Sequence, residues 1–255
     1  MIDFDNVTRC YGRKVAVDGL SLTVRPGELF ALLGPNGAGK TTTIKMAVGL
    51  LRPGSGTVRV CGHDVVRHPR RATRHIGYIP DEPFLYDKLS GREFLDFAAA
   101  MRGLNGSAAQ ARIAHQCESF SLGEFLDSLT ETYSHGMKQR LVFASALLHD
   151  PAVLVIDEPM VGLDPPSARL VKDLLRAQAA AGATVFLSTH TLAVAEEIAD
   201  RIAIVNHGRL HFLGTLAELQ QELSSPQSSL ESLFLKTIDN DGHATPPPSQ
   251  PEQLE

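Results

Sequence analysis

The feature that most constrains this chain is a glycine-rich loop at residues 34–41, which reads Gly-Pro-Asn-Gly-Ala-Gly-Lys-Thr. An apolar run predicted as a strand, 28–33, leads into the loop, and a segment with helical character, 41–50, follows it. Glycines in this setting let the backbone curl until successive N–H groups point at phosphate oxygens, and the helix N-terminus adds positive potential. The flanking strand and helix disfavour an ordinary turn, so the loop predicts a site for phosphate groups.

Two side chains of this loop have distinct expected roles. Lys40 is expected to reach the β- and γ-phosphates of a nucleotide, and the Thr41 hydroxyl is expected to ligate Mg²⁺. The other nucleotide contacts that we expect here are Gly34, Pro35, Asn36, Gly37, Ala38, Gly39 and Thr42. Kinases, GTPases, helicases and transport motors all use such a loop, so further motifs are needed to separate these classes.

An acidic pair follows the apolar run at residues 153–156, which reads Val-Leu-Val-Ile. This pattern predicts a buried strand that ends at Asp157, where the carboxylate can hold hydrated magnesium. Glu158 would then lie beside the γ-phosphate as a candidate general base. Without the glycine-rich loop, the same two acids would be interpreted as a solvated turn.

The predicted elements alternate in the order typical of an α/β fold. Strand character is found at residues 20–24, 28–33, 56–61, 153–156, 184–187 and 202–205. Helical character is found at 41–50, 91–101, 107–119, 134–149, 165–180 and 191–199. The helical stretch between about 90 and 149 interrupts the alternation, as an insertion would. Beyond it the strand segments are apolar throughout, which favours buried parallel strands.

The C-terminal segment differs in composition from the rest of the chain. A last short helix is predicted at 230–235, but from Asp239 onward Gly, Pro, Ser and Gln dominate, including a run of three prolines at 246–248. We expect residues 238–255 to form a disordered tail rich in Pro and Ser. A proline-rich ligand for a partner is the alternative.

Composition argues against several classes of protein. The chain of 255 residues carries 24 Lys and Arg against 29 Asp and Glu, which gives no basic excess, so we expect no nucleic-acid partner. Cys10, Cys61 and Cys117 are isolated, which predicts reduced thiols and neither a disulfide framework nor a zinc site. The first residues lack a basic region followed by an apolar stretch, so we expect no signal peptide. The apolar runs are far shorter than the roughly 20 residues that span a bilayer.

Residues 133–140, which read Tyr-Ser-His-Gly-Met-Lys-Gln-Arg, shortly precede the acidic strand. The ABC ATPase family has its LSGGQxQR signature at this place. Ser134 and Gly136 match the signature, whereas His135 and Met137 stand where Gly and Gln are usual. On the residues alone, Ser134 is a helix N-cap whose hydroxyl and neighbouring N–H groups can bind an anion. The resemblance extends from Met1 to about Thr237 and implies that Ser134 and Gly136 contact the nucleotide held by a partner subunit.

Further segments match the family in the expected order. The Gly-Leu-Asp sequence that ends at Asp164 resembles the D-loop, and the Ser-Thr-His sequence that ends at His190 resembles the switch-histidine motif. The resemblance implies that Asp164 lies at the nucleotide and that His190 contacts the γ-phosphate and orients the attacking water. Tyr11 occupies the place of the family's adenine-stacking aromatic residue. In isolation, His190 would be interpreted as a structural histidine and Tyr11 as a core tyrosine.

One position departs from the family pattern. Asp81, in the sequence Ile-Pro-Asp-Glu-Pro, replaces the usual glutamine that contacts magnesium and senses the membrane partner. A carboxylate can ligate Mg²⁺, but its charge repels the γ-phosphate unless the metal screens it. We therefore expect Asp81 to be a metal ligand together with Thr41 and Asp157.

The resemblance implies an α/β fold with a P-loop NTPase (RecA-like) core, an antiparallel β subdomain and an α-helical signature subdomain. We expect one ATPase domain over residues 1–237, with the helical subdomain at about 84–149. The implied catalytic residues are Glu158, His190 and Lys40, acting on ATP with Mg²⁺.

The function implied is that of an ATP-hydrolysing subunit that powers an ABC membrane transporter, with features of drug-resistance or ABC-2 exporters. Its expected partners are a separately encoded integral-membrane permease and a second ATPase subunit, identical or homologous. Its expected location is cytoplasmic, peripheral on the inner face of the cell membrane. The alternatives are a soluble ABC ATPase that acts on ribosomes or chromosomes, and a P-loop kinase, which would not explain the signature or the switch histidine.

Overall fold

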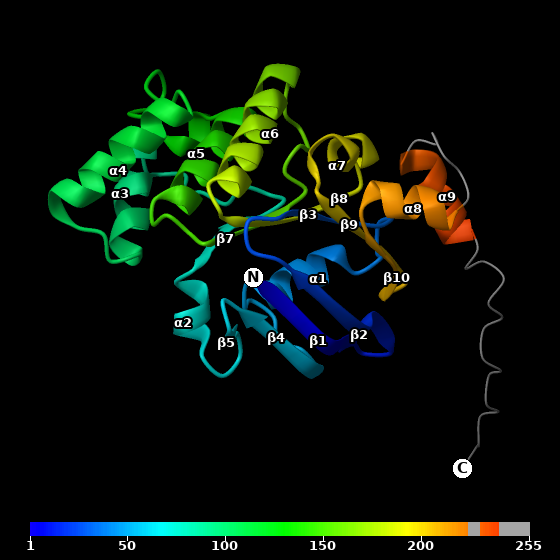
Figure 1. Ribbon diagram of the computed structural model, residues 1–255. Helices are drawn as coiled ribbons and strands as arrows, with labels where there is room; N and C mark the ends of the chain where they lie inside the picture. Colours follow the sequence, from blue (N-terminus) through cyan, green and yellow to red (C-terminus); the bar gives the residue numbers. More distant parts are fainter. Residues whose placement is uncertain (224–229, 240–255) are drawn as a thin grey trace, which may run out of the picture.

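A six-stranded sheet forms the centre of the computed structural model, which describes residues 1–223 and 230–239 (Figure 1). The strand order is β10-β9-β3-β8-β7-β6, and all neighbours are parallel except β10, which runs antiparallel to β9. The strands are β3 (Leu29–Leu33), β6 (Ile76–Ile79), β7 (Val153–Asp157), β8 (Thr184–Thr189), β9 (Arg201–Asn206) and β10 (Arg209–Gly214). The predicted parallel strands at 153–156, 184–187 and 202–205 are therefore confirmed.

The central strands are apolar throughout because both faces of the sheet are covered. In β3, Leu29, Ala31 and Leu33 pack into the core on one face, while Phe30 and Leu32 pack into the core on the other. All five residues of β3 are buried. This double burial holds the C-terminal end of β3, where the glycine-rich loop begins, in a fixed place in the molecule.

A second, antiparallel sheet of four strands lies below the first in the view of Figure 1, with α1 between the two sheets. Its order is β2-β1-β4-β5, and the strands are β1 (Ile2–Tyr11), β2 (Lys14–Val24), β4 (Ser55–Val60) and β5 (His63–Asp64). Helix α1 (Lys40–Ala47) places Ile44, Met46 and Ala47 in a core shared with both sheets. The predicted strands 20–24 and 28–33 are both present but belong to different sheets.

The predicted helical insertion is a cluster of three helices beside β6. These are α3 (Gly91–Met101), α4 (Gly106–Ser119) and α5 (His135–Leu147), followed along the chain by α6 (Pro165–Ala180) and α7 (Leu192–Ile198). Helices α6 and α7 cover the face of the six-stranded sheet opposite α1 (Figure 1). The helices predicted at these places are confirmed to within a few residues at each end.

Local hydrogen bonds explain where two of these helices begin. Ser90 and Glu93 form a reciprocal capping box at the start of α3. At α5 the Ser134 hydroxyl accepts a hydrogen bond from the backbone N–H of Met137, with a donor–acceptor distance of 3.3 Å. Ser134 is therefore an N-cap, and its backbone remains extended outside the helix.

The remaining elements are short α2 (Pro69–Thr73), a 3₁₀ turn η1 (Thr130–Thr132), α8 (Leu216–Glu222) and α9 (Leu230–Asp239). Helix α9 extends the helix predicted at 230–235 and reaches two residues into the predicted tail. The rest of that tail, 240–255, lies outside the described residues. Across residues 1–223 and 230–239, no helix is both long and apolar enough to cross a membrane.

Candidate active site

The glycine-rich loop connects β3 to α1 and is closed by its own backbone. The N–H of Ala38 donates to the carbonyl of Pro35 at 3.1 Å, and Gly39 has a φ of 105°. A Cβ atom added at Gly39 would lie 2.2 Å from the carbonyl oxygen of Ala16, so no side chain fits there. The loop therefore passes close to β2, and no side chain caps the N-terminus of α1.

Lys40, the first residue of α1, folds back into this loop. Its ammonium donates to the carbonyl of Gly34 at 2.9 Å and to that of Pro35 at 3.4 Å. The same Nζ lies 3.5 Å from Oε1 of Glu158, and the residue is only 6% exposed. The charge is thus buried and is compensated by two loop carbonyls and by the Glu158 carboxylate.

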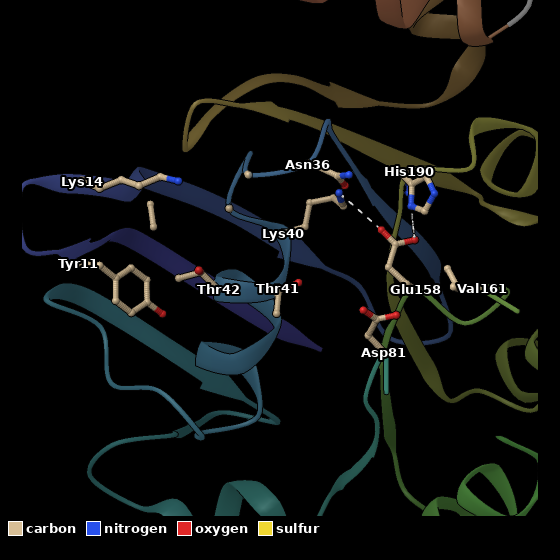
Figure 2. Close-up of a pocket in the computed structure, with 13 residues that line it drawn as sticks. Tyr11, Lys14, Asn36, Lys40, Thr41, Thr42, Asp81, Glu158, Val161 and His190 are labelled. Atoms are coloured by element: carbon tan, nitrogen blue, oxygen red, sulfur yellow. Dashed lines mark hydrogen bonds and ion pairs between the residues drawn. The ribbon is translucent and has the colours of Figure 1, made fainter. Parts of the chain in front are cut away.

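Glu158 follows β7 directly and connects Lys40 to His190, as the dashed lines in Figure 2 show. Its Oε2 lies 2.9 Å from Nδ1 of His190 and accepts a hydrogen bond from the backbone N–H of His190 at 3.2 Å. The backbone φ of Glu158 is 50°, an uncommon left-handed conformation for a residue with a side chain. A position of this kind persists when surrounding contacts hold it, and such positions are often functional.

Asp157 is 1% exposed and is held by the adjacent strand. Its Oδ1 accepts a hydrogen bond from the hydroxyl of Ser188, which is its register partner in β8. Ser188 has no role in the sequence-based prediction. The signal that could have found it is the parallel pairing of two strands that both end in polar residues.

Asp81 follows β6 by two residues and lines the same pocket, where it lies below Glu158 in the view of Figure 2. Partial burial and then the charges of Asp157 and Glu158 raise the pKa of Asp81, whereas His190 acts in the opposite direction. Burial, Asp157 and Asp81 likewise raise the pKa of Tyr78 to about 12. This edge of the sheet therefore carries an excess of negative charge that a cation would relieve.

The oxygen donors of this region could hold Mg²⁺ only together with oxygens from a bound substrate or water. Within the described ranges, no three His, Cys, Asp or Glu side chains lie close enough to hold a metal ion by themselves. Mg²⁺ is commonly held by one or two carboxylates together with substrate phosphates and water. Thr41 and Asp81 line the pocket and Asp157 is buried beside Glu158, which is a donor set of the appropriate type.

Tyr11 and Lys14 lie at the opposite end of the same pocket (Figure 2). They are register partners across the tight turn between β1 and β2. Tyr11 is 48% exposed, and the Arg9 guanidinium lies 5.2 Å from the centroid of its ring. A flat, half-exposed ring at this place can stack on a base, so Tyr11 is not the core residue that was the alternative.

The pocket has a volume of about 370 Å³. Its lining includes most of the predicted contacts, namely Tyr11, Asn36, Gly37, Gly39, Lys40, Thr41, Thr42, Asp81, Glu158 and His190. Lys14, Ala16 and Val161 also line it and are absent from the sequence-based prediction. The turn sequence Tyr-Gly-Arg-Lys, which predicts a hairpin, was the available signal for Lys14.

A second, separate pocket contains the other predicted contacts. Ser134, Gly136 and Asp164 line it together with His135, Met137, Arg140, Gly162 and Ser167. It opens where the N-termini of α5 and α6 lie close together. The structure therefore divides the predicted nucleotide contacts between two places on the described surface and does not bring Ser134 to Lys40.

Comparisons with known proteins identify the family of this chain. Residues 17–161 match the ABC transporter family. The daunorubicin/doxorubicin resistance ATP-binding protein DrrA of Streptomyces peucetius is 42% identical over 224 residues, covering 88% of this chain and 68% of the relative. The Nod factor export ATP-binding protein I of Burkholderia orbicola is 42% identical over 208 residues, covering 82% of this chain and 68% of the relative. A solved ATP-binding subunit of an ABC transporter has a TM-score of 0.88 and 33% identity, covering 93% of this chain and 99% of that one.

Proposed function

Because this chain belongs to the ABC transporter family as an ATP-binding, ATP-hydrolysing subunit, we propose that it powers an exporter through ATP-driven closure of two such subunits. The observation that carries this proposal is the chain of contacts from Lys40 through Glu158 to His190 at the end of the glycine-rich loop. The names of the relatives, which refer to drug resistance and to export, support the exporter class.

Within one subunit, each polar residue of the first pocket would have a separate task. Lys40 would exchange its contact with Glu158 for the phosphates, which releases the carboxylate to accept a proton from water. His190, which already contacts Glu158 through both its ring and its backbone, would orient that water and the γ-phosphate. Magnesium, held by Thr41, Asp157 and Asp81, would offset the negative charge on the phosphates.

The second pocket supports a dimeric mechanism. Ser134 and Gly136 lie at the open N-terminus of α5, which is suited to an anion but is separate from the pocket that contains Lys40. We infer that the anion is the γ-phosphate bound by a second subunit, identical or homologous. Closure of two subunits would then complete both sites, and hydrolysis would open them again.

An aromatic surface next to Asp81 is the proposed contact for a membrane permease. Phe84 is 72% exposed, and its ring packs edge-on against Tyr86, which in turn packs against Phe97 on α3. Exposed apolar side chains that gather in this way often mark a protein interface. Because the surface begins three residues after Asp81, movement of a docked permease would reach the nucleotide pocket directly.

The same proposal places the chain at the cytoplasmic face of a membrane, bound to a separately encoded permease. A non-transport ABC ATPase acting on ribosomes or chromosomes is not favoured, since the named relatives serve resistance and export. The test is affinity purification of the tagged chain from membranes solubilised in mild detergent. A polytopic protein at comparable stoichiometry supports the transporter role, and its loss in a Phe84→Ser variant would support the docking surface.

Recovery of ribosomes, nucleic acid or soluble protein alone would contradict the transporter role. ATP turnover of the same preparation is measured separately, so this outcome would not count against the ATPase chemistry. A Phe212→Ser change would not serve as a control because Phe212 is buried. The exposed Leu50, on the surface after α1, provides a matched control as Leu50→Ser.

A further inference from the structure

His135 makes a contact that the glycine usual at this signature position could not make. Its Nε2 lies 3.0 Å from the carbonyl oxygen of Val161. A carbonyl oxygen only accepts hydrogen bonds, so Nε2 must carry the proton and donate it. The first residue of α5 is thus tied to the loop that follows Glu158.

The imidazole also packs against the backbone at Gly162. A Cβ atom added at Gly162 would lie 2.9 Å from Cδ2 and 3.1 Å from Nε2 of His135. The φ of Gly162 is 72°, so this position is restricted to glycine by both its conformation and its neighbour. The segment Val161–Gly162 is therefore held by a hydrogen bond and by ring packing from the same side chain.

One backbone hydrogen bond connects this segment to Glu158, the candidate base. The backbone N–H of Val161 donates to the carbonyl oxygen of Glu158 at 3.3 Å, which closes the turn after β7. Val161 itself lines the pocket that contains Lys40 and Glu158, whereas His135 and Gly162 line the second pocket. The left-handed backbone at Glu158 is the kind of strained position that needs such support.

We propose that His135 is a positioning residue that holds the turn at Val161–Gly162 and thereby orients Glu158 of its own chain, a role that rests on the proposed function. It connects the second pocket to the first within one subunit.

Three substitutions separate the hydrogen bond from the packing. His135→Phe retains a ring but has no donor, His135→Gly restores the residue usual in the family, and His135→Gln retains an N–H donor. In the full chain, His135→Phe and His135→Gly should lower kcat for ATP about five- to tenfold, the effect of losing one hydrogen bond. The KM for ATP should stay within about twofold, and His135→Gln should recover most of the turnover.

His115→Phe is the matched control because His115 is an exposed histidine on α4. Thermal unfolding of each variant identifies any that fail to fold, and at least one of the two donor-free variants must remain folded for the comparison. Wild-type kcat in a folded His135→Phe or His135→Gly chain would overturn the proposal. A lowered kcat that His135→Gln does not improve would assign the effect to packing and overturn the hydrogen-bond role.

Two further measurements keep this inference separate from the proposed function. Amide hydrogen exchange of residues 158–163 in the nucleotide-free chain should accelerate in His135→Phe and not in His115→Phe, whatever the ATPase activity. In a Glu158→Gln background, ATP-dependent dimerisation should be unchanged by His135→Phe. A weakened dimer would mean that His135 contacts the partner's nucleotide instead, whereas an inactive wild-type chain would contradict only the proposed function.

Discussion

The two pockets of this molecule differ in how far one chain organises them. In the first, the buried ammonium of Lys40 lies against the carboxylate of Glu158, whose side chain is 11% exposed, and His190 completes the group. In the second, Ser134 and Asp164 are exposed and lie at two helix N-termini. The comparison teaches that a single chain brings the charged groups of the first pocket into contact with one another, whereas it leaves the polar groups of the second pocket exposed to solvent.

The largest effect is expected from Glu158→Gln in the first pocket. An amide cannot accept the proton of water, so ATP turnover should fall about 10²- to 10⁴-fold, the usual contribution of a general base. Binding should persist, and an ATP-bound dimer should accumulate in gel filtration. Glu124→Gln, an exposed change in the loop after α4, is the control. Wild-type turnover in Glu158→Gln would remove Glu158 as the base.

Ser134→Ala tests whether the second pocket acts on another subunit. Loss of a hydrogen bond to a charged group should reduce turnover about 10- to 100-fold. Mixing Ser134→Ala with Glu158→Gln chains should restore part of the activity, because one of the two composite sites then has both residues intact. Phosphate release by the mixture is the measurement. No recovery in a mixture that forms dimers would contradict completion of the site by a partner.

Ser134 also caps α5, so its structural role needs a separate control. Loss of an N-cap costs about 1 kcal/mol of stability, which Ser134→Ala should show as a lower Tm. Ser134→Asn retains a capping side chain and should restore the Tm. Turnover should remain low in Ser134→Asn if the hydroxyl acts on the nucleotide, and recovery of turnover together with the Tm would indicate that capping alone matters.

Tyr11→Ala is expected to have a smaller effect, confined to binding in the first pocket. Stacking on a half-exposed ring is at the low end of about 1–3 kcal/mol per base, so the KM for ATP should rise roughly five- to tenfold. Tyr11→Phe retains the ring and should behave like the wild type. Measurement of kcat and KM separates this outcome from damage to Glu158. An unchanged KM in Tyr11→Ala would remove the stacking role.

The smallest effect is expected from Asp81→Ala. If the carboxylate helps to hold magnesium, the Mg²⁺ concentration for half-maximal turnover should rise about two- to fivefold, the scale of an exposed charge interaction. Glu82→Ala, the adjacent exposed acid, is the control for loss of general negative charge. ATPase activity and Mg²⁺ dependence that both remain at wild-type values would show that Asp81 is not a ligand.

Much of the fold was predictable because its signals are local. The helices at Gly91–Met101 and Pro165–Ala180 have the bounds that their sequence patterns indicate, since caps and prolines act within one turn. The strand β1 and the capped helix α8 were absent from the prediction. In β1 the alternation of buried and exposed residues is irregular because bulges interrupt its pairing with β2.

The sequence by itself determined which reactive groups the first pocket contains. Lys40 and Glu158 directly follow the loop and the strand that hold them, so local patterns were enough to find both. Tertiary structure alone decided which groups meet. Ser188 reaches Asp157 only because β7 and β8 are neighbours, and Lys14 faces the pocket only because a hairpin pairs it with Tyr11. Likewise, His135 and Val161 are brought together by the packing of α5 against the loop after β7, a contact between distant segments that no local pattern encodes.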